Sequence, residues 1–376
     1  MLCRETARGP ARDWGCSRAR NKIDDVKRTE VAIAGGGIIG LSAALELADA
    51  GLRVTIFDRG RGMAEASSAA AGMLAASDPE NPAALRPLAE LSARLYPKFL
   101  ERIEELSGER VPIRTRRVIQ GMLELPEDFQ ELTEAELETA APGIVTEELR
   151  FFSLDEESLD PRDLAAALPK AARAMGITLL EDTEITEVRE RGGEIEIDTS
   201  AGRWVAEKFI HASGAWAARL SGLPITPRKG QMVMVEEPRP ALAGVVLRSP
   251  GVYLVPRGDG RVVIGATVED AGFDKQVEQK AIAGLLDKAA ALWPPVRQSR
   301  MVESWAGLRP ATPDGLPVID ACGERCWFAG GHFRNGILLA PGTARLLREM
   351  ILGEPLSIDV SDFGCGRFAA AAARGS

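Results

Sequence analysis

The spacing of apolar residues changes from that of a strand to that of a helix and back near the front of the chain. Residues 31–34 form a short apolar run, and residues 41–50 consist of helix-forming residues. Gly51 ends this helix, and residues 53–57 read as another strand, which leads into Asp58. The pattern predicts a strand, a helix and a second strand within about 30 residues, which is the size of one nucleotide-binding unit.

The rest of the chain contains further elements of both kinds. Helical spacing is found at residues 85–106, 129–139, 164–175, 274–292 and 337–351. Strand-like stretches are found at residues 177–180, 184–188, 194–197, 204–211, 231–236, 251–256, 261–267 and 326–329. The strands between 231 and 267 form their own group, with a hairpin turn at Gly258 to Gly260. We expect an α/β fold (α+β overall) in which a Rossmann-like domain is split along the chain by an inserted, mostly antiparallel domain.

A glycine fingerprint stands between the first predicted strand and its helix. The run Gly35-Gly-Gly37-Ile-Ile-Gly40 has the dinucleotide-binding spacing, and each glycine has a mechanical reason. Gly35 allows the tight turn, Gly37 lets the backbone approach a pyrophosphate, and Gly40 lets helix and strand pack closely. The helix N-terminus attracts phosphates, and Asp58 can accept a hydrogen bond from a ribose hydroxyl. The alternative is a purely structural glycine turn, which would not explain why a strand, a helix, a second strand and an acid accompany the glycines.

The fingerprint alone does not distinguish NAD from FAD. Residues 66–74 are mostly small and carry hydroxyls, which allows close approach of a flat ring and its phosphates, although an alanine-rich helix start has the same composition. A second glycine turn, Ala212-Ser-Gly214-Ala-Trp216, follows a predicted strand and is placed to contact a dinucleotide again. No second pyridine-nucleotide motif and no Cys-x-x-x-x-Cys pair is present, so a disulfide reductase fed by NADPH is not expected. Cys322 and Cys326 read as structural thiols.

Composition narrows the classes of function. The chain has 376 residues, enough for about two domains, and its net charge of −9 argues against a broad nucleic-acid-binding surface. Its two histidines and five cysteines lack the spacing of a zinc site, so no metal is expected. The odd cysteine count favours reduced thiols and a cytoplasmic location. The apolar stretch at 31–45 is too short and too rich in glycine to span a membrane, and no membrane contact is expected.

Residues 1–28 lack apolar periodicity. They contain scattered arginines and acids but no continuous apolar segment, so they resemble neither a secretory signal nor an organellar transit peptide. We expect a disordered extension, or a start codon placed too far upstream.

Several motifs together resemble the D-amino-acid oxidase family of FAD-dependent amine oxidases, and within it the enzymes that oxidise glycine for thiamine biosynthesis. They are Gly35 to Gly40, Ser67 to Leu74, Tyr253-Leu-Val-Pro256, Ile264-Gly-Ala-Thr-Val268, Trp305-Ala-Gly-Leu-Arg-Pro310 and Gly331-His-Phe-Arg-Asn-Gly-Ile337. The resemblance covers residues 31–353.

The resemblance implies an activity and a set of partners. The activity is oxidative deamination of glycine, or of sarcosine or small D-amino acids, to the imine or glyoxylate, ammonia and hydrogen peroxide, with oxygen as acceptor. The product would feed thiazole synthesis, with thiazole synthase as a partner, and the enzyme would be a homo-oligomer. The resemblance also implies an FAD-binding domain at 29–107, 153–220 and 306–364, a substrate-binding domain at 108–152 and 221–305, and a flexible tail at 365–376.

The resemblance also implies which residues form the site. Arg309 matches the arginine that pairs with the substrate carboxylate, and Tyr253, Arg334 and Val268 match other substrate residues; some relatives have methionine at the position of Val268. The residues implied at the cofactor are Gly35, Gly37, Ile38, Ile39, Gly40, Asp58, Arg59, Ser67, Ser68, Ala71, Gly72, Met73, Ile185, Gly214, His332, Phe333, Arg334, Asn335, Gly336, Ile337 and Leu338. Covalent relatives hold FAD through a cysteine near the position of Gly307, and no cysteine lies between Glu303 and Ala321, so the FAD is expected to be non-covalent.

Physical chemistry supports these roles without deciding every one. Only arginine offers a rigid fork for a planar carboxylate, and Arg309 stands in an otherwise apolar stretch, although a structural ion pair would also explain it. Tyr253 could equally be a core aromatic residue. His332 could be a base, but its glycine-rich loop favours a positioning role. Since hydride transfer from Cα needs no acid–base side chain, we expect no catalytic side chain.

Two alternatives remain open. The first is a sarcosine or D-amino-acid oxidase or dehydrogenase of the same family. The second is a non-catalytic FAD-binding assembly protein, which the presence of Arg309, Tyr253 and Arg334 disfavours.

Overall fold

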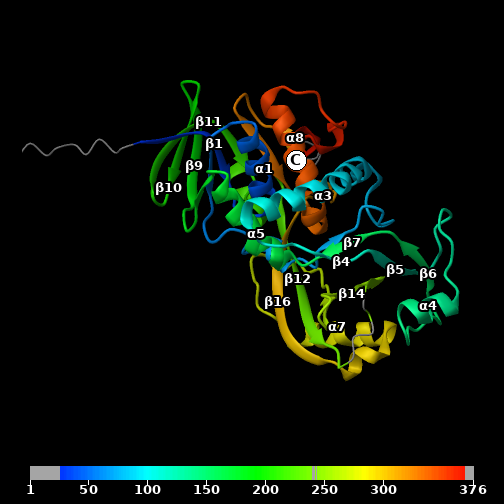
Figure 1. Cartoon of the computed structure of the whole chain (residues 1–376). Helices are drawn as coiled ribbons and strands as arrows, with labels where there is room; N and C mark the ends of the chain where they lie inside the picture. The colour runs from blue at the N-terminus through cyan, green and yellow to red at the C-terminus, as the bar shows by residue number, and fades with distance from the viewer. Residues whose placement is uncertain (1–25, 239–241, 243, 369–376) are drawn as a thin grey trace, which may run out of the picture.

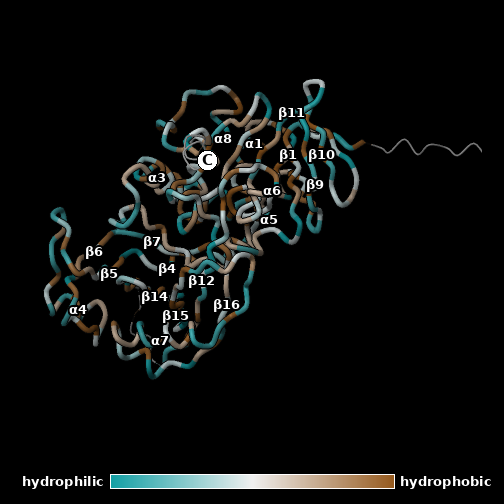
Figure 2. Tube along the Cα trace, turned by 180° about the vertical axis from the view of Figure 1, so that it is seen from behind, coloured by the Kyte–Doolittle hydropathy of each residue, from teal (hydrophilic) through white to brown (hydrophobic). Residues whose placement is uncertain are grey.

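The computed structural model describes residues 26–238, 242 and 244–368. Its helices and strands gather around two large sheets, which lie in the upper and the lower part of Figure 1. Figure 2 shows the same division from behind, with α1, α3, α5 and α8 on one side and α4 and α7 on the other. A cavity lies between the two parts and is lined by residues of both.

The first sheet is built around β1 (Lys27–Ala34), which is buried on both faces in its second half. Val31 and Ile33 pack into the core formed with the helices, while Ala32 and Ala34 pack into a second core with the strands of the opposite layer. A strand buried on both faces needs a continuous apolar run, which is what the sequence provides here. The helices of this part are α1 (Ile38–Asp49), α3 (Arg86–Ser107), α5 (Pro161–Ala174) and α8 (Gly336–Leu352).

The strand order of the first sheet is β17-β18-β11-β1-β2-β8, with β10 and β9 continuing from β11. β1 pairs in parallel with both β2 and β11, while β10 pairs antiparallel with β9 and β11. The bounds are β2 (Val54–Phe57), β8 (Thr178–Leu180), β9 (Ile185–Arg191), β10 (Glu194–Thr199), β11 (Gly202–His211), β17 (Val318–Ala321) and β18 (Cys326–Gly330).

The second sheet is antiparallel except for the pair β13–β5, in the order β16-β12-β15-β14-β13-β5-β6. Along β12, Val233 and Val235 face the core beneath α7, whereas Met232 and Met234 face the opposite core, on the side of the first sheet. The bounds are β5 (Arg117–Met122), β6 (Arg150–Leu154), β12 (Thr226–Glu236), β13 (Val245–Ser249), β14 (Val252–Pro256), β15 (Arg261–Gly265), β16 (Arg300–Ala311), α4 (Glu134–Ala140) and α7 (Gln279–Leu292).

Short elements connect the two parts. A third sheet has the order β3-β7-β4, and its strands are β3 (Met73–Leu74), β4 (Ile113–Thr115) and β7 (Glu157–Leu159). The remaining short helices are α2 (Ala66–Ala69), α6 (Ala218–Ser221), η1 (Ala83–Leu85), η2 (Gly214–Trp216), η3 (Pro294–Gln298), η4 (Phe333–Asn335), η5 (Ser361–Phe363) and η6 (Cys365–Phe368).

The predicted mixed fold is confirmed, but its longest strand was missed. β16 contains Arg309 and Pro310, which hide the strand in the sequence. The proline is tolerated because β16 is the edge strand of its sheet, next to β12. The predicted helix at 129–139 begins only at Glu134, after Thr133 caps it, and the one at 274–292 begins at Gln279.

Both ends of the described chain are more ordered than we expected. β1 begins at Lys27, inside the predicted extension, and Lys27 pairs with Trp204. The predicted flexible tail begins with η6, where the Arg367 guanidinium is bonded to Asp314. Residues 1–25 and 369–376 lie outside the described residues. Within those that are described, no helix combines the length and hydrophobicity needed to cross a membrane, and no cluster of potential metal ligands occurs.

Candidate active site

The fingerprint folds as a tight turn between β1 and α1. Gly35 has φ of +108°, and a Cβ there would lie 2.3 Å from the carbonyl oxygen of Ala212. A Cβ on Gly40 would lie 1.9 Å from the carbonyl oxygen of Gly35, so this glycine serves the close packing of helix on strand. Asp58, at the end of β2, accepts hydrogen bonds from the backbone N–H groups of Gly36 at 2.7 Å and Gly60 at 2.8 Å. A carboxylate has further lone pairs, which leaves Asp58 able to accept from a ligand.

The small-residue segment lies directly beside this turn. The Ser67 hydroxyl accepts a hydrogen bond from the backbone N–H of Ile38 at 3.0 Å, which ties α2 to the start of α1. Gly72 has φ of +86°, and a Cβ there would lie 2.1 Å from the carbonyl oxygen of Leu159. The segment therefore contains one turn of the alternative, a helix start, and then passes as extended backbone along the site.

One cavity of about 810 Å³ extends from the fingerprint to the second sheet. Its volume lies in the range of ligand-binding cavities. The predicted residues that line it are Gly35, Gly37, Ile38, Ile39, Asp58, Arg59, Ser67, Ala71, Gly72, Met73, Ile185, Gly214, Tyr253, Val268, Arg309, His332, Phe333, Arg334, Asn335, Gly336 and Ile337.

Three predicted cofactor residues do not line this cavity. Gly40 faces the first strand, as described above. The Ser68 hydroxyl donates to the carbonyl oxygen of Glu65, and Ser68 lines a separate small cavity. Leu338, two positions after the start of α8, is buried in the helical core. Gly40 thus has the packing role expected of it, whereas the contacts of Ser68 and Leu338 with the cofactor stay predictions.

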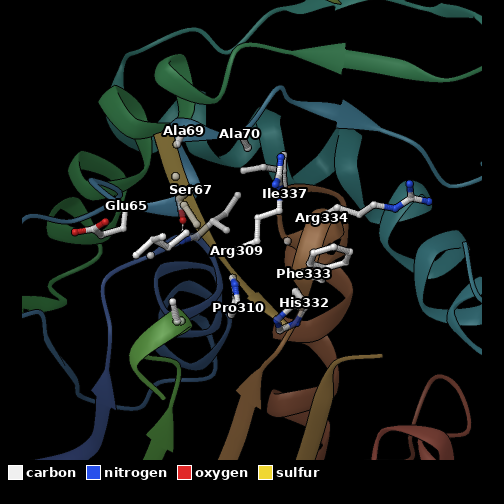
Figure 3. Close-up of a pocket in the computed structure, with 18 of the residues that line it drawn as sticks. Glu65, Ser67, Ala69, Ala70, Arg309, Pro310, His332, Phe333, Arg334 and Ile337 are labelled. Carbon is white, nitrogen blue, oxygen red and sulfur yellow. Dashed lines mark hydrogen bonds between the residues drawn. The ribbon is translucent and has the colours of Figure 1, made fainter. Parts of the chain in front are cut away.

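Arg309 occupies the middle of the cavity (Figure 3). Its Nη1 donates to the carbonyl oxygen of Thr267 at 3.0 Å. The guanidinium lies over Gly230 of the neighbouring strand, where a Cβ would lie 2.1 Å from Nη1. Gly230 therefore leaves free the space that the Arg309 guanidinium occupies. The sequence analysis missed this residue, although a glycine inside a strand is a signal of such close approach.

Tyr253 sits on β14 in a similar arrangement. A Cβ on Gly265 of β15 would lie 2.5 Å from the Tyr253 hydroxyl oxygen. The hydroxyl donates to Met232 Sδ at 3.3 Å, and burial raises the pKa of Tyr253 although the Arg309 charge opposes the shift, so the phenol stays neutral. Val268 lines the same end of the cavity but is 62% exposed, which places it at the entrance.

Arg334 lies at the cavity but points away from Arg309 (Figure 3). Its guanidinium bonds to Glu80 at 3.1 Å and Asp78 at 3.2 Å, both in the segment that follows β3. Asn335 also bonds to this segment, through Asn81 at 3.1 Å. In this structure Arg334 therefore holds the cavity wall.

His332 is buried at the cavity wall. Its Nε2 lies 3.0 Å from the Thr343 hydroxyl, and burial lowers the pKa of His332 to about 3. The ring is neutral at physiological pH and a very weak base, so its geometry agrees with the positioning role.

The cavity wall also has an aromatic part, at the end of the predicted second glycine turn, and a charged part that the sequence analysis missed. Trp216 lines the cavity, and the Arg59 guanidinium stacks over its ring at 3.5 Å. Arg248, in the apolar strand β13, lines the cavity beside Asp78, and buried Glu156 lies behind it. The signal that indicated Arg309, a charge within an apolar stretch, applies equally to Arg248.

Comparison with known proteins decides the family. The pattern that defines the FAD dependent oxidoreductase family matches residues 30–350 of this chain. The chain belongs to this family. The FAD dependent oxidoreductase assignment confirms the predicted cofactor and enzyme class, and it covers both large sheets.

Relatives within this family cover nearly the whole chain. The glycine oxidase of Geobacillus kaustophilus is 36% identical over 90% of this chain and 97% of its own length. The crystal structure of glycine oxidase from the same organism superposes with a TM-score of 0.86 at 35% identity, covering 91% of this chain and 99% of that chain. The bifunctional protein ThiO/ThiG of Synechocystis is 33% identical over 90% of this chain, which spans only 54% of that protein.

The site fits FAD as its family requires. The cavity begins at a turn of glycines at a helix N-terminus, which suits phosphates, and continues along small residues past Trp216 to Arg309. At Gly307, near which the resemblance places the cysteine of covalent relatives, a Cβ would lie 2.7 Å from the Ala69 Cβ, which leaves no room for a larger side chain without a shift.

Proposed function

We propose that this protein is an FAD-dependent glycine oxidase with oxygen as the electron acceptor. The observation that carries the proposal is the position of Arg309, whose guanidinium lies in the same cavity as the fingerprint glycines. The similarity to glycine oxidases over nine-tenths of the chain supports it.

Arg309 binds the substrate carboxylate. Nη1 donates to the Thr267 carbonyl, and the guanidinium also acts on the neighbouring Tyr253 hydroxyl. A guanidinium has five N–H donors, so donors remain for a bidentate carboxylate pair. Tyr253 shares this end of the cavity and stays neutral, which lets its hydroxyl contact the substrate. The two side chains thereby fix the direction in which the substrate Cα points.

FAD, when bound, supplies the acceptor for the hydride that leaves Cα. The residues predicted to hold it are those of the fingerprint, the small-residue segment and the start of α8. Since Gly336 and Ile337 line the cavity, the positive end of the α8 dipole faces negative charge that develops there. In total, glycine, oxygen and water give glyoxylate, ammonia and hydrogen peroxide.

The narrower parts of the assignment rest on the relatives. The fusion named ThiO/ThiG supports thiazole synthase as a partner and thiamine biosynthesis as the setting. The described cysteines Cys322, Cys326 and Cys365 are free, in keeping with a cytoplasmic location, and burial raises the pKa of Cys322 to about 12. A homo-oligomer, and the division into the two domains given above, belong to the same proposal.

A substrate panel with peroxide detection tests the function. Purified protein should be yellow, should release its flavin on acid precipitation, and should produce peroxide with glycine. Higher kcat/KM for sarcosine or D-alanine than for glycine would favour another amine oxidase of the family. A yellow protein that reduces its flavin with none of these substrates would contradict the proposal and favour a binding protein.

A further inference from the structure

Arg248 is a buried arginine with unused hydrogen-bond donors in the cavity wall. Its side chain is 7% exposed, and its Nε donates to the Gln120 side-chain oxygen. Neither Nη1 nor Nη2 has a hydrogen-bond partner in the described structure. Burial of unsatisfied guanidinium donors is costly, so the position calls for an acceptor.

Arg248 belongs to the substrate end of the cavity. On the β13–β14 ladder it stands directly opposite Tyr253. Asp78 contacts both Arg248, at 3.4 Å, and Arg334, at 3.2 Å. Arg248 therefore lies beside Tyr253 and shares Asp78 with Arg334, two residues for which the resemblance implies a place at the substrate.

The two carboxylates beside Arg248 do not satisfy its terminal N–H groups. Nη1 lies 3.4 Å from both Asp78 and Glu156, but neither contact has hydrogen-bond geometry. Asp78 is shared with Arg334, so it does not neutralise Arg248 alone. Burial raises the pKa of Glu156 to about 7, against the effect of the Arg248 charge, so near neutral pH Glu156 carries only part of its negative charge.

The open space beside Arg248 is also suited to a small polar group. Ser249 and Gly251, which follow Arg248 along the hairpin, both line the cavity. Gly251 presents no side chain there. A substrate held by Arg309 can thus extend along the β13–β14 hairpin towards Arg248.

We infer that Arg248 forms a second carboxylate subsite, so that the enzyme accepts amino acids that carry an additional carboxylate besides the one held by Arg309. The inference rests on the proposed function, since it assumes that Arg309 binds the first carboxylate. The oxidation at Cα is unchanged, and the second carboxylate serves only recognition.

Matched substrate pairs test this subsite. Iminodiacetate differs from sarcosine, and D-aspartate from D-alanine, by one carboxylate in place of hydrogen, so the ratio of kcat/KM within each pair isolates that group. Arg248→Met should lower the acidic-to-neutral ratio at least tenfold in one of the pairs. Arg117→Met is the matched control, because Arg117 lies on the adjacent β5, bonds to Ser153 and does not line the cavity, and it should leave both ratios unchanged.

Two further variants keep the test informative if Arg248→Met does not fold. Arg248→Lys keeps the charge but not the fork, and should lower the same ratio by a smaller factor. Glu156→Gln removes a competing carboxylate and should raise it. Ratios unchanged in both pairs by all three variants at positions 248 and 156 would overturn the subsite.

A binding experiment separates this inference from the proposed function. Malonate and acetate are titrated into the FAD-bound protein, and their Kd values are read from the change in flavin absorbance. Tighter binding of malonate that is lost in Arg248→Met supports the subsite even if glycine is not oxidised. Equal effects of Arg248→Met on malonate and acetate contradict it, whereas absence of glycine turnover alone contradicts only the proposed function.

Discussion

The two ends of the cavity are built on different principles. At the fingerprint end, the wall is backbone and small side chains, and glycines such as Gly35 and Gly72 let main chains approach within contact distance. At the other end, the wall is made of charged side chains from separate strands, and glycines such as Gly230 leave the space that those side chains occupy. The first end recognises a shape common to all dinucleotides; the second recognises charge at a particular place, so it can differ between related enzymes.

The comparison predicts that the fingerprint end fails by steric overlap. Gly40→Ala places a methyl 1.9 Å from a backbone oxygen, and overpacking of this severity should cost about 3 kcal/mol or more in the free energy of unfolding. Thermal unfolding should show the loss, together with a low flavin content. Gly37→Ala, whose Cβ meets only the Ser67 hydroxyl at 3.2 Å, should lose flavin while keeping most of its stability. Equal stability of both variants would contradict the distinction between packing and ligand approach.

The substrate end should instead fail in kinetics. Arg309→Ala removes a charge-assisted bidentate pair worth about 1.5 to 3 kcal/mol, so kcat/KM for glycine should fall at least about tenfold. Flavin content should be little changed, and lysine should rescue only partly because it lacks the fork. Turnover of an amine without a carboxylate should be insensitive to the change. Wild-type kcat/KM in Arg309→Ala would mean that the carboxylate binds elsewhere, with Arg334 as the next candidate.

Substitution of Gly230, beneath the Arg309 guanidinium, should lower kcat/KM almost as much as substitution of Arg309. Gly230→Ala would place a methyl where the guanidinium lies, so the fork must move and kcat/KM for glycine should fall by roughly tenfold. The matched control is Gly284→Ala in α7, where nothing lies within 4 Å of the added methyl. This variant should keep its kinetics and gain about 0.5–1 kcal/mol in stability from helix propensity. Identical kinetics in the two variants would remove the role of Gly230.

The buried carboxyl of Glu156, beside Arg248, should have a smaller effect on stability, and this effect should depend on pH. Burial raises the pKa of Glu156 from 4.5 to about 7. A carboxyl whose pKa is raised by folding stabilises the protein fully below its unfolded pKa and loses this contribution as the pH rises through about 7. The stability of Glu156→Gln relative to wild type should therefore increase from pH 5 to pH 8, by an amount on the order of 1 kcal/mol. Denaturant unfolding at both pH values measures the gain, and a pH-independent difference would contradict the assigned shift.

The segment before β1 should have no effect on flavin binding or activity. Deletion of residues 1–25 leaves β1 intact from Lys27, so flavin content and kcat/KM should match those of the full chain. A truncated protein that loses its FAD would show that this segment contributes to the fold.

Local sequence is enough to predict the fingerprint end. Strand, glycine turn, helix and acid are consecutive, so local sterics and hydrogen bonding fix their relation before any distant contact forms. The same locality explains why the starts of α5 and α8 were found close to their observed positions. Family resemblance added Arg309 and Tyr253, whose roles no local rule could provide.

Only the tertiary structure decided how the substrate end is assembled. Arg309 and Gly230 are neighbours because β16 pairs with β12, and Arg248 faces Tyr253 because β13 pairs with β14. The ion contacts among Arg334, Asp78 and Arg248 join three distant segments. Strand pairing over long sequence separation depends on burial in the whole molecule, and a charged residue in an apolar strand shows that a partner is needed without showing where it comes from.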